Sequence, residues 1–255
     1  MSPTPLHRLQ AWPRLSLAAL PTRLVPARNL RRALGTRAPE LWIKMDADTG
    51  FALGGNKVRK LETELALERL DGVTHLVTAG GPQSNHCRVT AAAAAHLGLG
   101  CVLAINGKAD EPPRGNALLH RLFGAEIRTV RTREDRASAM EEAAREIAEQ
   151  GGRALVVPLG ASTGRGALGY ALAFSELCEQ LAVLPERERT WIFVSASSCG
   201  TLAGLLVGVS LLGREDVRLV GVSADASAFD LRRDTLRLAT EGAALLGWGE
   251  PPREG

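Results

Sequence analysis

Aromatic residues and net charge are both scarce in this sequence, and each scarcity excludes a class of function. Phe, Trp and Tyr together make up 4% of the residues, which is too few for a platform that stacks nucleic-acid bases. Lys and Arg number 31, and Asp and Glu number 28, so the formal net charge is only +3. Such a balance is not typical of a protein that binds a phosphate backbone. We therefore expect no nucleic-acid partner.

The sequence also lacks closely spaced cysteines and long apolar runs. Cys87, Cys101, Cys178 and Cys199 are too far apart to form a CxxC motif for a metal or a redox pair. No uninterrupted apolar run reaches the roughly 18 residues of a membrane-spanning helix. The first residues also lack the apolar core of a secretory signal. We expect reduced thiols, a cytoplasmic protein, no membrane partner and no bound metal.

What remains is an ordinary globular composition with extra glycine. Hydrophobic residues are 45% and charged residues 23% of the chain, which excludes a disordered protein. The length of 255 residues suits one large domain or two small ones. Glycine accounts for 27 residues, and this excess predicts tight turns or close approaches of the backbone to a ligand.

Predicted strands and helices alternate along most of the chain. The expected strands are short apolar runs at 41–44, 75–78, 101–105, 126–130, 154–157, 191–194 and 217–222. The expected helices are longer stretches at 56–70, 84–97, 116–123, 136–150, 166–181, 201–212 and 226–246. This alternation predicts an α/β fold, in which helices cover both faces of a parallel sheet. Ligands of such sheets bind beyond the carboxyl ends of the strands, where three loops of this chain are unusual.

The first unusual loop runs from Gly54 to Lys60 and reads GGNKVRK. Its two glycines allow a sharp turn, after which Lys57 stands at the start of a helix. The partly positive helix N-terminus disfavours a cation there. That effect lowers the pKa of the amine and frees it to act as a nucleophile. The alternative is that Lys57 is a solvated surface lysine beside Arg59 and Lys60.

The second loop, TAGGPQSNH at 78–86, crowds polar side chains at a helix start. Such a start favours a carboxylate or a phosphate. The alternative is a helix cap, in which Ser84 or Asn85 satisfies backbone N–H groups. A cap accounts for one polar residue rather than for four in a row. His86 taken alone is more typical of a structural histidine than of an acid or a base.

The third loop, SASSCGT at 195–201, follows the strand expected at 191–194. A loop of small residues that leads into a helix cradles a phosphate through backbone N–H groups, hydroxyls and the helix dipole. The loop lacks the GK[ST] ending of a P-loop and the GxGxxG pattern of a dinucleotide site. The alternative is a plain tight turn between a strand and a helix.

Together these loops resemble one family. The motifs that carry the resemblance are GGNKVRKLE at 54–62, TAGGPQSNHCR at 78–88, PLGAST at 158–163, GALGY at 166–170 and GTLAG at 200–204. Their combination and order are similar to those of the 1-aminocyclopropane-1-carboxylate deaminase/D-cysteine desulfhydrase family, over about residues 20–246. The resemblance implies a pyridoxal-phosphate enzyme with the tryptophan-synthase-β-like fold, also called fold type II.

The resemblance also implies roles for individual residues. Lys57 matches the lysine that forms a Schiff base with pyridoxal phosphate and later moves a proton at the substrate carbon. Lys60 matches a basic residue near the cofactor phosphate, and Asn85 matches the residue that hydrogen-bonds the pyridoxal hydroxyl. Ser84, Asn85 and His86 occupy the loop that holds the substrate carboxylate. The phosphate loop matches Ser197, Ser198, Cys199, Gly200 and Thr201.

The family further implies two domains, a small-molecule substrate and a homodimer. The small α/β domain is expected at 61–160, and the large cofactor-binding domain at 1–60 and 161–255, with the cofactor cleft between them. The substrate is expected to be a small amino acid. His86 favours D-cysteine desulfhydrase chemistry, which releases sulfide, pyruvate and ammonia, because ring-opening deaminases more often carry Gln at this place. A 1-aminocyclopropane-1-carboxylate deaminase or a cysteate sulfo-lyase is the alternative.

Two departures from the family pattern bear on activity. The run Met45-Asp46-Ala47-Asp48 stands where the family usually has an Arg-Asp-Asp-like sequence, which alters local salt bridges. Family members also continue beyond the last residue of this chain, with a tyrosine near the substrate and a polar residue at the pyridine nitrogen. Tyr170, the single tyrosine, does not replace that one by motif. We therefore expect a C-terminally shortened fold, and a second hypothesis is a remnant that binds the cofactor with weak or no turnover.

Overall fold

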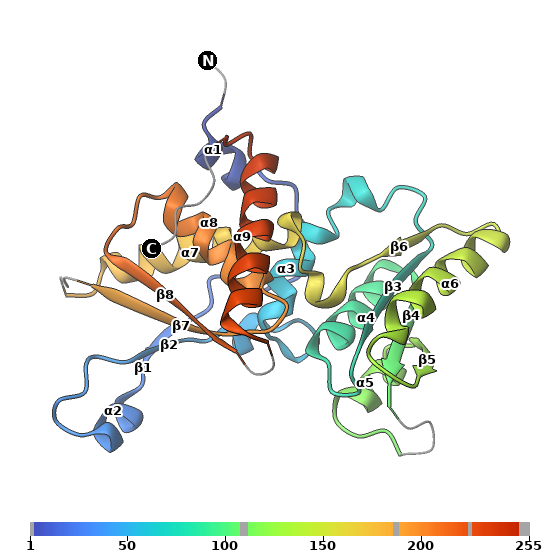
Figure 1. Ribbon diagram of the computed structural model, residues 1–255, viewed down its shortest axis with the longest axis horizontal. Helices are drawn as coiled ribbons and strands as arrows, with labels where there is room; N and C mark the ends of the chain where they lie inside the picture. Colours follow the sequence, from blue (N-terminus) through green and yellow to red (C-terminus); the bar gives the residue numbers. More distant parts are fainter. Residues whose placement is uncertain (1–2, 108–111, 186–188, 224–225, 250–255) are drawn as a thin grey trace.

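The computed structural model describes residues 3–107, 112–185, 189–223 and 226–249. Figure 1 shows a four-stranded sheet with its helices on one side of the molecule, and a helical layer with a two-stranded sheet on the other. Helix α3 (Asn56–Glu64) lies between them. It packs on α4 (Asn85–Leu97) of the first region and on α7 (Gly164–Ala182) of the second. The loops that surround α3 therefore come from both regions.

The four-stranded sheet is parallel throughout, as the alternation predicts. Its strand order is β5-β4-β3-β6. The bounds are β3 (His75–Gly80), β4 (Gly100–Asn106), β5 (Glu126–Val130) and β6 (Ala154–Val156). Helix α5 (Asn116–Leu122) packs beside α4. On β3, Leu76 packs in the core cluster that includes α4, whereas Val77 packs against α6 (Asp135–Glu149). Burial on both faces explains why these strands read as continuous apolar runs.

The second region consists of helices packed on one another and on a parallel strand pair. Besides α7, its elements are β7 (Thr190–Ala196), α8 (Gly200–Leu211), β8 (Val217–Ser223) and α9 (Ala228–Leu245). Ile192 and Val194 of β7 pack on the helices, while Trp191 and Phe193 are 56% and 68% exposed. Because side chains alternate along a strand, these two aromatic residues share one open face of the sheet.

Glycines allow the helices around α3 to approach closely. A Cβ on Gly169 of α7 would lie 2.1 Å from the carbonyl oxygen of Arg59 in α3. A Cβ on Gly204 of α8 would lie 2.0 Å from the carbonyl oxygen of Ala167 in α7. Neither gap leaves room for another carbon atom in a close-packed interior. These contacts hold α3, and with it the loop before α3, against the helical layer.

Gly204→Ala is expected to lower the free energy of unfolding by about 2 kcal/mol. Helix propensity alone favours Ala over Gly by about 1 kcal/mol, but the clash forces α8 away from α7, and such overpacking costs about 3 kcal/mol. Thermal unfolding should show a Tm that is lower by roughly 4–8 °C. Gly249→Ala is the control, since no described residue beyond its chain neighbours lies within 4 Å of a Cβ built at that position. Equal Tm values for the two variants would contradict the close approach.

The sequence pattern misses the N-terminal elements α1 (Pro5–Gln10), β1 (Leu24–Pro26) and α2 (Arg28–Leu34). β1 pairs antiparallel with β2 (Trp42–Lys44), the strand expected at 41–44, and α2 connects the two. Both strands have three residues and α2 buries no side chain, so no apolar period marks them. We call residues 24–44 the arm, and Figure 1 shows its helix projecting away from the helical layer.

Most expected elements end within two residues of the observed ones, but the helix expected at 56–70 ends at Glu64. Leu65 is its C-cap, the backbone is extended at Ala66, and a separate 3-10 turn, η3, covers Leu67–Arg69. The expectation of a longer helix is therefore wrong. Apolar residues continue at helical spacing across the break, so periodicity alone does not reveal it.

The structure also bears on membranes, metals and disulfides. In the described ranges, every helix falls short of the length and apolar character that a membrane crossing requires. The same residues contain no group of three or more His, Cys, Asp and Glu side chains placed to hold a metal ion. The four cysteines are free thiols, three of them buried.

Candidate active site

The turn before α3 requires glycine. Gly54 and Gly55 have φ values of +71° and +115°, a region that side chains with a Cβ rarely adopt. A Cβ on Gly54 would also lie 1.8 Å from the carbonyl oxygen of Ala47. After this turn α3 begins, with Asn56 and Lys57 as its first two residues. The glycine pair thus decides where the lysine of the first loop stands.

Lys57 is half-buried in the first turn of α3, and its Nζ lies 3.3 Å from Asn56 Oδ1. Burial lowers the pKa of Lys57 below its ordinary value, because desolvation disfavours the charged ammonium. The sequence predicts a lowered pKa because Lys57 stands at a helix N-terminus. In the structure the pKa is lowered by burial instead. A lowered pKa enlarges the fraction of neutral amine, which is the form that attacks a carbonyl carbon.

Further along α3, the buried Arg59 side chain anchors the helix to the second region. Its NH1 and NH2 groups donate to Glu176 of α7 at 3.0 and 2.9 Å, and its Nε donates to Asp46 at 3.1 Å. Lys44 pairs with the same Glu176 carboxylate. We call Arg59, Glu176, Asp46 and Lys44 the ion-pair cluster. The buried Tyr170 hydroxyl donates to Asp46, so the single tyrosine belongs to this cluster.

Lys60, on the same helix, reaches the third loop. Its Nζ donates to Ser162 Oγ at 2.8 Å, and Ser162 Oγ donates in turn to Ser198 Oγ at 2.8 Å. A Cβ on Gly200 would lie 2.4 Å from Lys60 Nζ, so the ammonium stands against the start of α8. Backbone N–H groups in the first turn of a helix lack partners within the helix. We call Lys60, Ser162, Ser198 and this helix start the anion cradle.

The charge state of the anion cradle fits a phosphate group. Lys60 is fully buried, and burial, followed by repulsion from Lys57, holds the pKa of Lys60 well below its ordinary value. The Glu64 carboxylate offsets this only in part, since it is engaged by Arg69 and Thr163. Among the described residues, the Lys60 ammonium is hydrogen-bonded only to a hydroxyl, and burial of a charge with so little compensation is costly. A phosphate dianion would supply the missing charge, so the residues present fit the phosphate of the cofactor expected from the motifs.

Replacing Lys60 with Met should weaken the binding of pyridoxal phosphate by about 1–3 kcal/mol, the range of one charge-assisted hydrogen bond. Met has a similar length without the charge, so the apo protein should melt at the same temperature or a higher one. Fluorescence titration of the apo protein measures the effect as a rise in Kd. An unchanged Kd would remove Lys60 from the anion cradle.

The second loop places its three predicted residues in different surroundings at the start of α4. Ser84 is the N-cap, and its Oγ accepts from the Cys87 N–H at 3.2 Å. Ser84 is therefore a helix cap, as the alternative interpretation of this loop predicts. Asn85 is the first helical residue and is exposed. His86 is 3% exposed, with its Nε2 atom 2.9 Å from Thr78 Oγ1.

His86 carries no charge in this position. Thr78 Oγ1 donates its hydrogen to the Val157 carbonyl at 2.7 Å, so His86 Nε2 donates to Thr78 and Nδ1 bears the lone pair. Burial, followed by repulsion from Lys60 and Lys57, holds the pKa of His86 well below its ordinary value. In the described part of the chain, Nδ1 is buried without a hydrogen-bond partner. The ring is thus a neutral group inside the fold, and its place at a substrate carboxylate stays a prediction.

The third loop also divides into exposed and buried residues. Ser197 and Ser198 are exposed, whereas Cys199 is 3% exposed and has a φ of +60° at the start of α8. Burial raises the pKa of the Cys199 thiol, which keeps it protonated. Thr201 Oγ1 accepts from Asn56 Nδ2 at 3.2 Å. This last contact ties the third loop directly to the start of α3.

Sequence reasoning misses three residues that join the loops, namely Asn56, Ser162 and Arg88. Asn56 lies in GGNK, Ser162 in PLGAST and Arg88 in QSNHCR, so the motifs contain them without indicating their partners. Arg88 NH2 donates to the Gly54 carbonyl at 2.5 Å, which ties the second loop to the turn before Lys57. All three loops therefore meet around α3.

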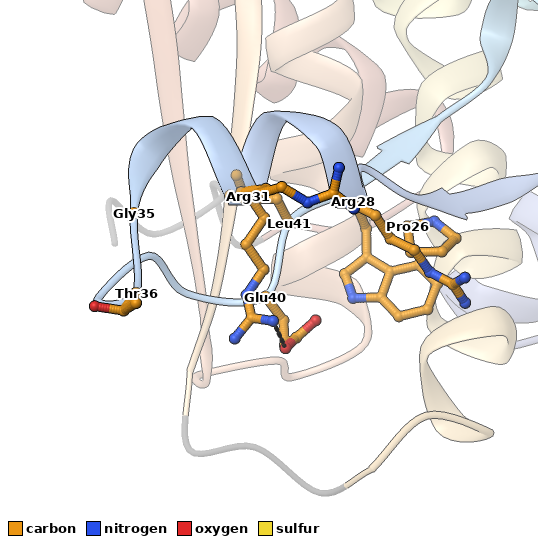
Figure 2. Close-up of a pocket in the computed structure, with 9 residues that line it drawn as sticks. Pro26, Arg28, Arg31, Gly35, Thr36, Glu40 and Leu41 are labelled. Carbon is orange, nitrogen blue, oxygen red and sulfur yellow. Dashed lines mark ion pairs between the residues drawn. The ribbon is translucent and has the colours of Figure 1, made fainter.

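A separate hollow of about 700 Å³ lies on the arm rather than at this site. Figure 2 shows residues that line it, among them Arg31 and Glu40, which form an ion pair at 3.1 Å. None of the residues that line it belongs to the three loops. The size of this hollow therefore says nothing about the candidate active site.

Comparison with known proteins places the chain in a family. Residues 15–247 match the model of the pyridoxal-phosphate dependent enzyme family. The chain is similar to the D-cysteine desulfhydrases of Salmonella paratyphi B and Salmonella newport, each 38% identical over 242 residues. The matched part covers 92% of this chain and 71% of each relative.

Solved structures agree with this placement. The crystal structure of an ACC deaminase homologue has a TM-score of 0.86 at 35% identity, and the match covers 100% of this chain and 76% of that one. A pyridoxal 5'-phosphate-dependent aspartate racemase has a TM-score of 0.63 at 20% identity, over 79% and 56% of the two chains, which is a likeness of fold alone. These matches confirm the tryptophan-synthase-β-like α/β fold expected from the motifs. The chain belongs to the pyridoxal-phosphate dependent enzyme family, and pyridoxal phosphate is its cofactor.

Proposed function

We propose that this protein is a lyase that acts on a small amino acid, with D-cysteine as the favoured substrate. The observation that carries the proposal is the meeting of Lys57, the anion cradle and the polar start of α4 around the single helix α3. The 38% identity to D-cysteine desulfhydrases supports the choice of substrate. In the proposed reaction, D-cysteine and water yield hydrogen sulfide, pyruvate and ammonia.

Lys57 is proposed to hold the cofactor as a Schiff base and to move a proton at the substrate carbon. Bound pyridoxal phosphate supplies the electron sink for the carbon that loses this proton. The lowered pKa of Lys57 serves both tasks, because each needs the amine in its neutral form. Half-burial of the side chain also limits the access of water to the amine.

The anion cradle is proposed to hold the cofactor phosphate. Lys60 supplies the charge, and Ser162 and Ser198 supply hydroxyl groups. The buried Cys199 would contribute through the backbone rather than through its thiol. The residues of the third loop that are proposed to bind are Ser197, Ser198, Cys199, Gly200 and Thr201.

The start of α4 is proposed to face the substrate and the cofactor ring. Its free N–H groups favour a carboxylate, and the Ser84 hydroxyl caps the helix beside them. Asn85 is exposed and is proposed to bond the ring hydroxyl. His86 is proposed to support this loop as a neutral side chain, since its ring is buried against Thr78.

We propose that the two regions are the domains of the enzyme. The small domain would comprise residues 61–160, and the large cofactor-binding domain residues 1–60 and 161–255. The parallel sheet of β3 to β6 falls within the first range, and the α7, α8 and α9 layer falls within the second. The site around α3 would then lie in the cleft between the domains.

A product screen tests the proposed function. Cofactor-loaded protein is incubated with D-cysteine, L-cysteine, cysteate and 1-aminocyclopropane-1-carboxylate, and Lys57→Arg serves as the background control. Sulfide and pyruvate from D-cysteine at about 1 s⁻¹ or faster, the low end of ordinary enzymes, would support the proposal. Sulfite from cysteate, or a 2-oxo acid from the cyclopropane substrate, would support the corresponding alternative. Cofactor binding without any product would support the remnant hypothesis.

We propose that the protein is a homodimer that associates through the arm. Helix α2 buries no side chain, and Leu30 and Leu34 on it are 53% and 62% exposed. Apolar side chains exposed together favour association. Light scattering should give twice the chain mass for the wild type and the single mass for Leu30→Asp/Leu34→Asp. A single mass for the wild type would exclude the dimer.

We propose a cytoplasmic location, because the four cysteines are free and unpaired thiols are typical of a reducing compartment. Fractionation of the source cells tests this, with an antibody against the chain as the probe. Recovery of the protein outside the cytoplasmic fraction would contradict the proposal.

A further inference from the structure

Arg88 is a buried cation whose hydrogen-bond partners are neutral oxygens. The residue is 7% exposed. Its NH1 donates to Asn85 Oδ1 at 2.8 Å and to Asn116 Oδ1 at 2.9 Å, and its NH2 donates to the Gly54 carbonyl. Among the described residues, no carboxylate pairs with this guanidinium. Because an unpaired buried charge is costly, the arrangement points to a role beyond packing.

These contacts determine which way the side-chain amides of Asn85 and Asn116 are oriented, that is, where the oxygen and the NH2 group of each one point. A guanidinium only donates hydrogen bonds, so the atom of Asn116 that faces Arg88 is the oxygen. The Asn116 Nδ2 group then lies on the other side, where it donates to the Gln83 carbonyl at 2.8 Å and to Asn85 Oδ1 at 3.0 Å. Asn85 Oδ1 thus accepts from both Arg88 and Asn116, which occupies its two lone pairs.

The Asn85 side chain is left with its NH2 group free. Asn85 is exposed at the first position of α4, and within the described ranges its Nδ2 group donates to no protein acceptor. A reversed amide would set that NH2 group against two donors, one from Arg88 and one from Asn116. The orientation of the amide is therefore locked on the side chain that is proposed to bond the cofactor ring.

We infer that Arg88 and Asn116 are positioning residues that fix the Asn85 amide with its NH2 group toward the ring oxygen of the cofactor. This inference rests on the role proposed above for Asn85. An N–H donor stabilises a ring oxygen that carries negative charge, whereas a reversed amide would present an oxygen to that oxygen. Arg88 also holds the carbonyl of Gly54, three residues before Lys57.

Asn116→Asp tests the inference because it keeps the shape of the side chain. The new carboxylate still accepts from Arg88, but it sets an oxygen against Asn85 Oδ1 where Asn116 donates an N–H. Asn85 Oδ1 then keeps only the donor from Arg88 and is repelled by the carboxylate, so the amide is no longer locked and its reversed form gains population. We expect the Kd for pyridoxal phosphate, from fluorescence titration of the apo protein, to rise about tenfold. The visible absorption band of the bound cofactor should shift. The Tm of the apo protein should change little, because the charge pair gained with Arg88 offsets the hydrogen bond lost to the Gln83 carbonyl.

Two controls separate positioning from the effect of an added charge. Asn106→Asp places a carboxylate beside another arginine, because Asn106 Oδ1 accepts from Arg136, and it should leave the Kd and the band unchanged. In an Asn85→Ala background, Asn116→Asp should have no further effect, because the amide to be reversed is gone. A further tenfold loss in that background would overturn the inference. An unchanged Kd and band for Asn116→Asp alone would also overturn it.

Failure of this inference is distinguishable from failure of the proposed function. The readouts are cofactor binding and absorption, so they do not depend on which amino acid is turned over. If Asn85→Ala weakens binding and Asn116→Asp does not, only the inference is overturned. If Asn85→Ala itself leaves the Kd and the band unchanged, the proposed role of Asn85 is wrong and the inference falls with it.

Discussion

Lys57→Ala is expected to abolish the covalent attachment of pyridoxal phosphate and all turnover. The chain has only four lysines, Lys44, Lys57, Lys60 and Lys108. Lys44 is held in the ion-pair cluster, and Lys60 is held against Ser162 in the anion cradle, so neither is placed to replace Lys57. The measurement is the visible absorbance of the protein after incubation with the cofactor, followed by borohydride reduction and mass spectrometry of its peptides.

Lys57→Arg is the matched control, because it keeps the positive charge and most of the volume. A guanidinium forms no Schiff base and stays protonated. This variant should therefore lack the visible band, while the anion cradle still binds the cofactor phosphate without a covalent bond. A retained band in Lys57→Ala, or a reduced adduct on another lysine of the wild type, would contradict the assignment.

Glu176→Gln is expected to lower the free energy of unfolding by about 3 kcal/mol at neutral pH, the low end of the cost of breaking a buried ion pair, because Arg59 keeps Asp46 as its other partner. The side chains of Arg59 and Glu176 are only 2% and 14% exposed, and Lys44 shares the same carboxylate. Gln keeps the shape, but its NH2 group would face a donor of Arg59. Denaturant unfolding at pH 7 measures the loss, and a loss below about 1 kcal/mol would contradict a buried pair.

The same substitution should change how stability depends on pH. Burial by itself raises the pKa of Glu176, but hydrogen bonds from Arg59 and Lys44 outweigh it and hold that pKa below its ordinary value of 4.5. A carboxylate whose pKa is lower in the folded state stabilises the fold above pH 4.5, and this stabilisation is lost as the pH falls through the folded pKa. Glu176→Gln lacks that carboxylate, so its unfolding free energy should fall less steeply with acid.

Glu126→Gln is the control for both measurements. Glu126 pairs with Arg128, and its side chain is 58% exposed, so solvent screens the pair and the loss should stay below about 1 kcal/mol. The same series of unfolding measurements in acid is run on this variant as the reference for the loss of one exposed carboxylate. If Glu176→Gln behaved like this control at every pH, the ion-pair cluster would not anchor α3.

Local sequence is sufficient for most of the secondary structure and for the loops of the site. Strands buried on both faces, such as β3 and β4, give continuous apolar runs, whereas α6 buries Met140, Ala143 and Ile147 at helical spacing on one face. This contrast needs no knowledge of distant contacts. The glycine pair Gly54 and Gly55 and the cap at Ser84 are also local, because a turn or a helix start depends on neighbouring residues.

The arm and the end of α3 escape the same reasoning for a physical reason. A helix is recognised in sequence by the face that it buries, and α2 buries none of its side chains. At Leu65, by contrast, the apolar spacing continues although the helix stops, because Ala66 and Leu70 after the break also pack inward. An apolar period in the sequence indicates which residues are buried. In α2 a helix forms without burial, and after Leu65 burial continues without a helix.

The partners of each site residue depend on the tertiary structure. Ser162 and Ser198 are 36 residues apart in the chain, and Arg59 and Glu176 are 117 apart, so no local pattern relates them. The sequence places Asn85 and His86 in one polar run, yet the rotation of α4 on the sheet leaves only Asn85 exposed.

The motifs alone indicated which chemical groups are available for catalysis, because an amine, a hydroxyl or a helix start depends on only a few neighbouring residues. Which of these groups lie within reach of one another was decided by the packing of α3 between the four-stranded sheet region and the helical layer. That packing depends on close contacts between residues far apart in the chain, such as Gly169 against Arg59.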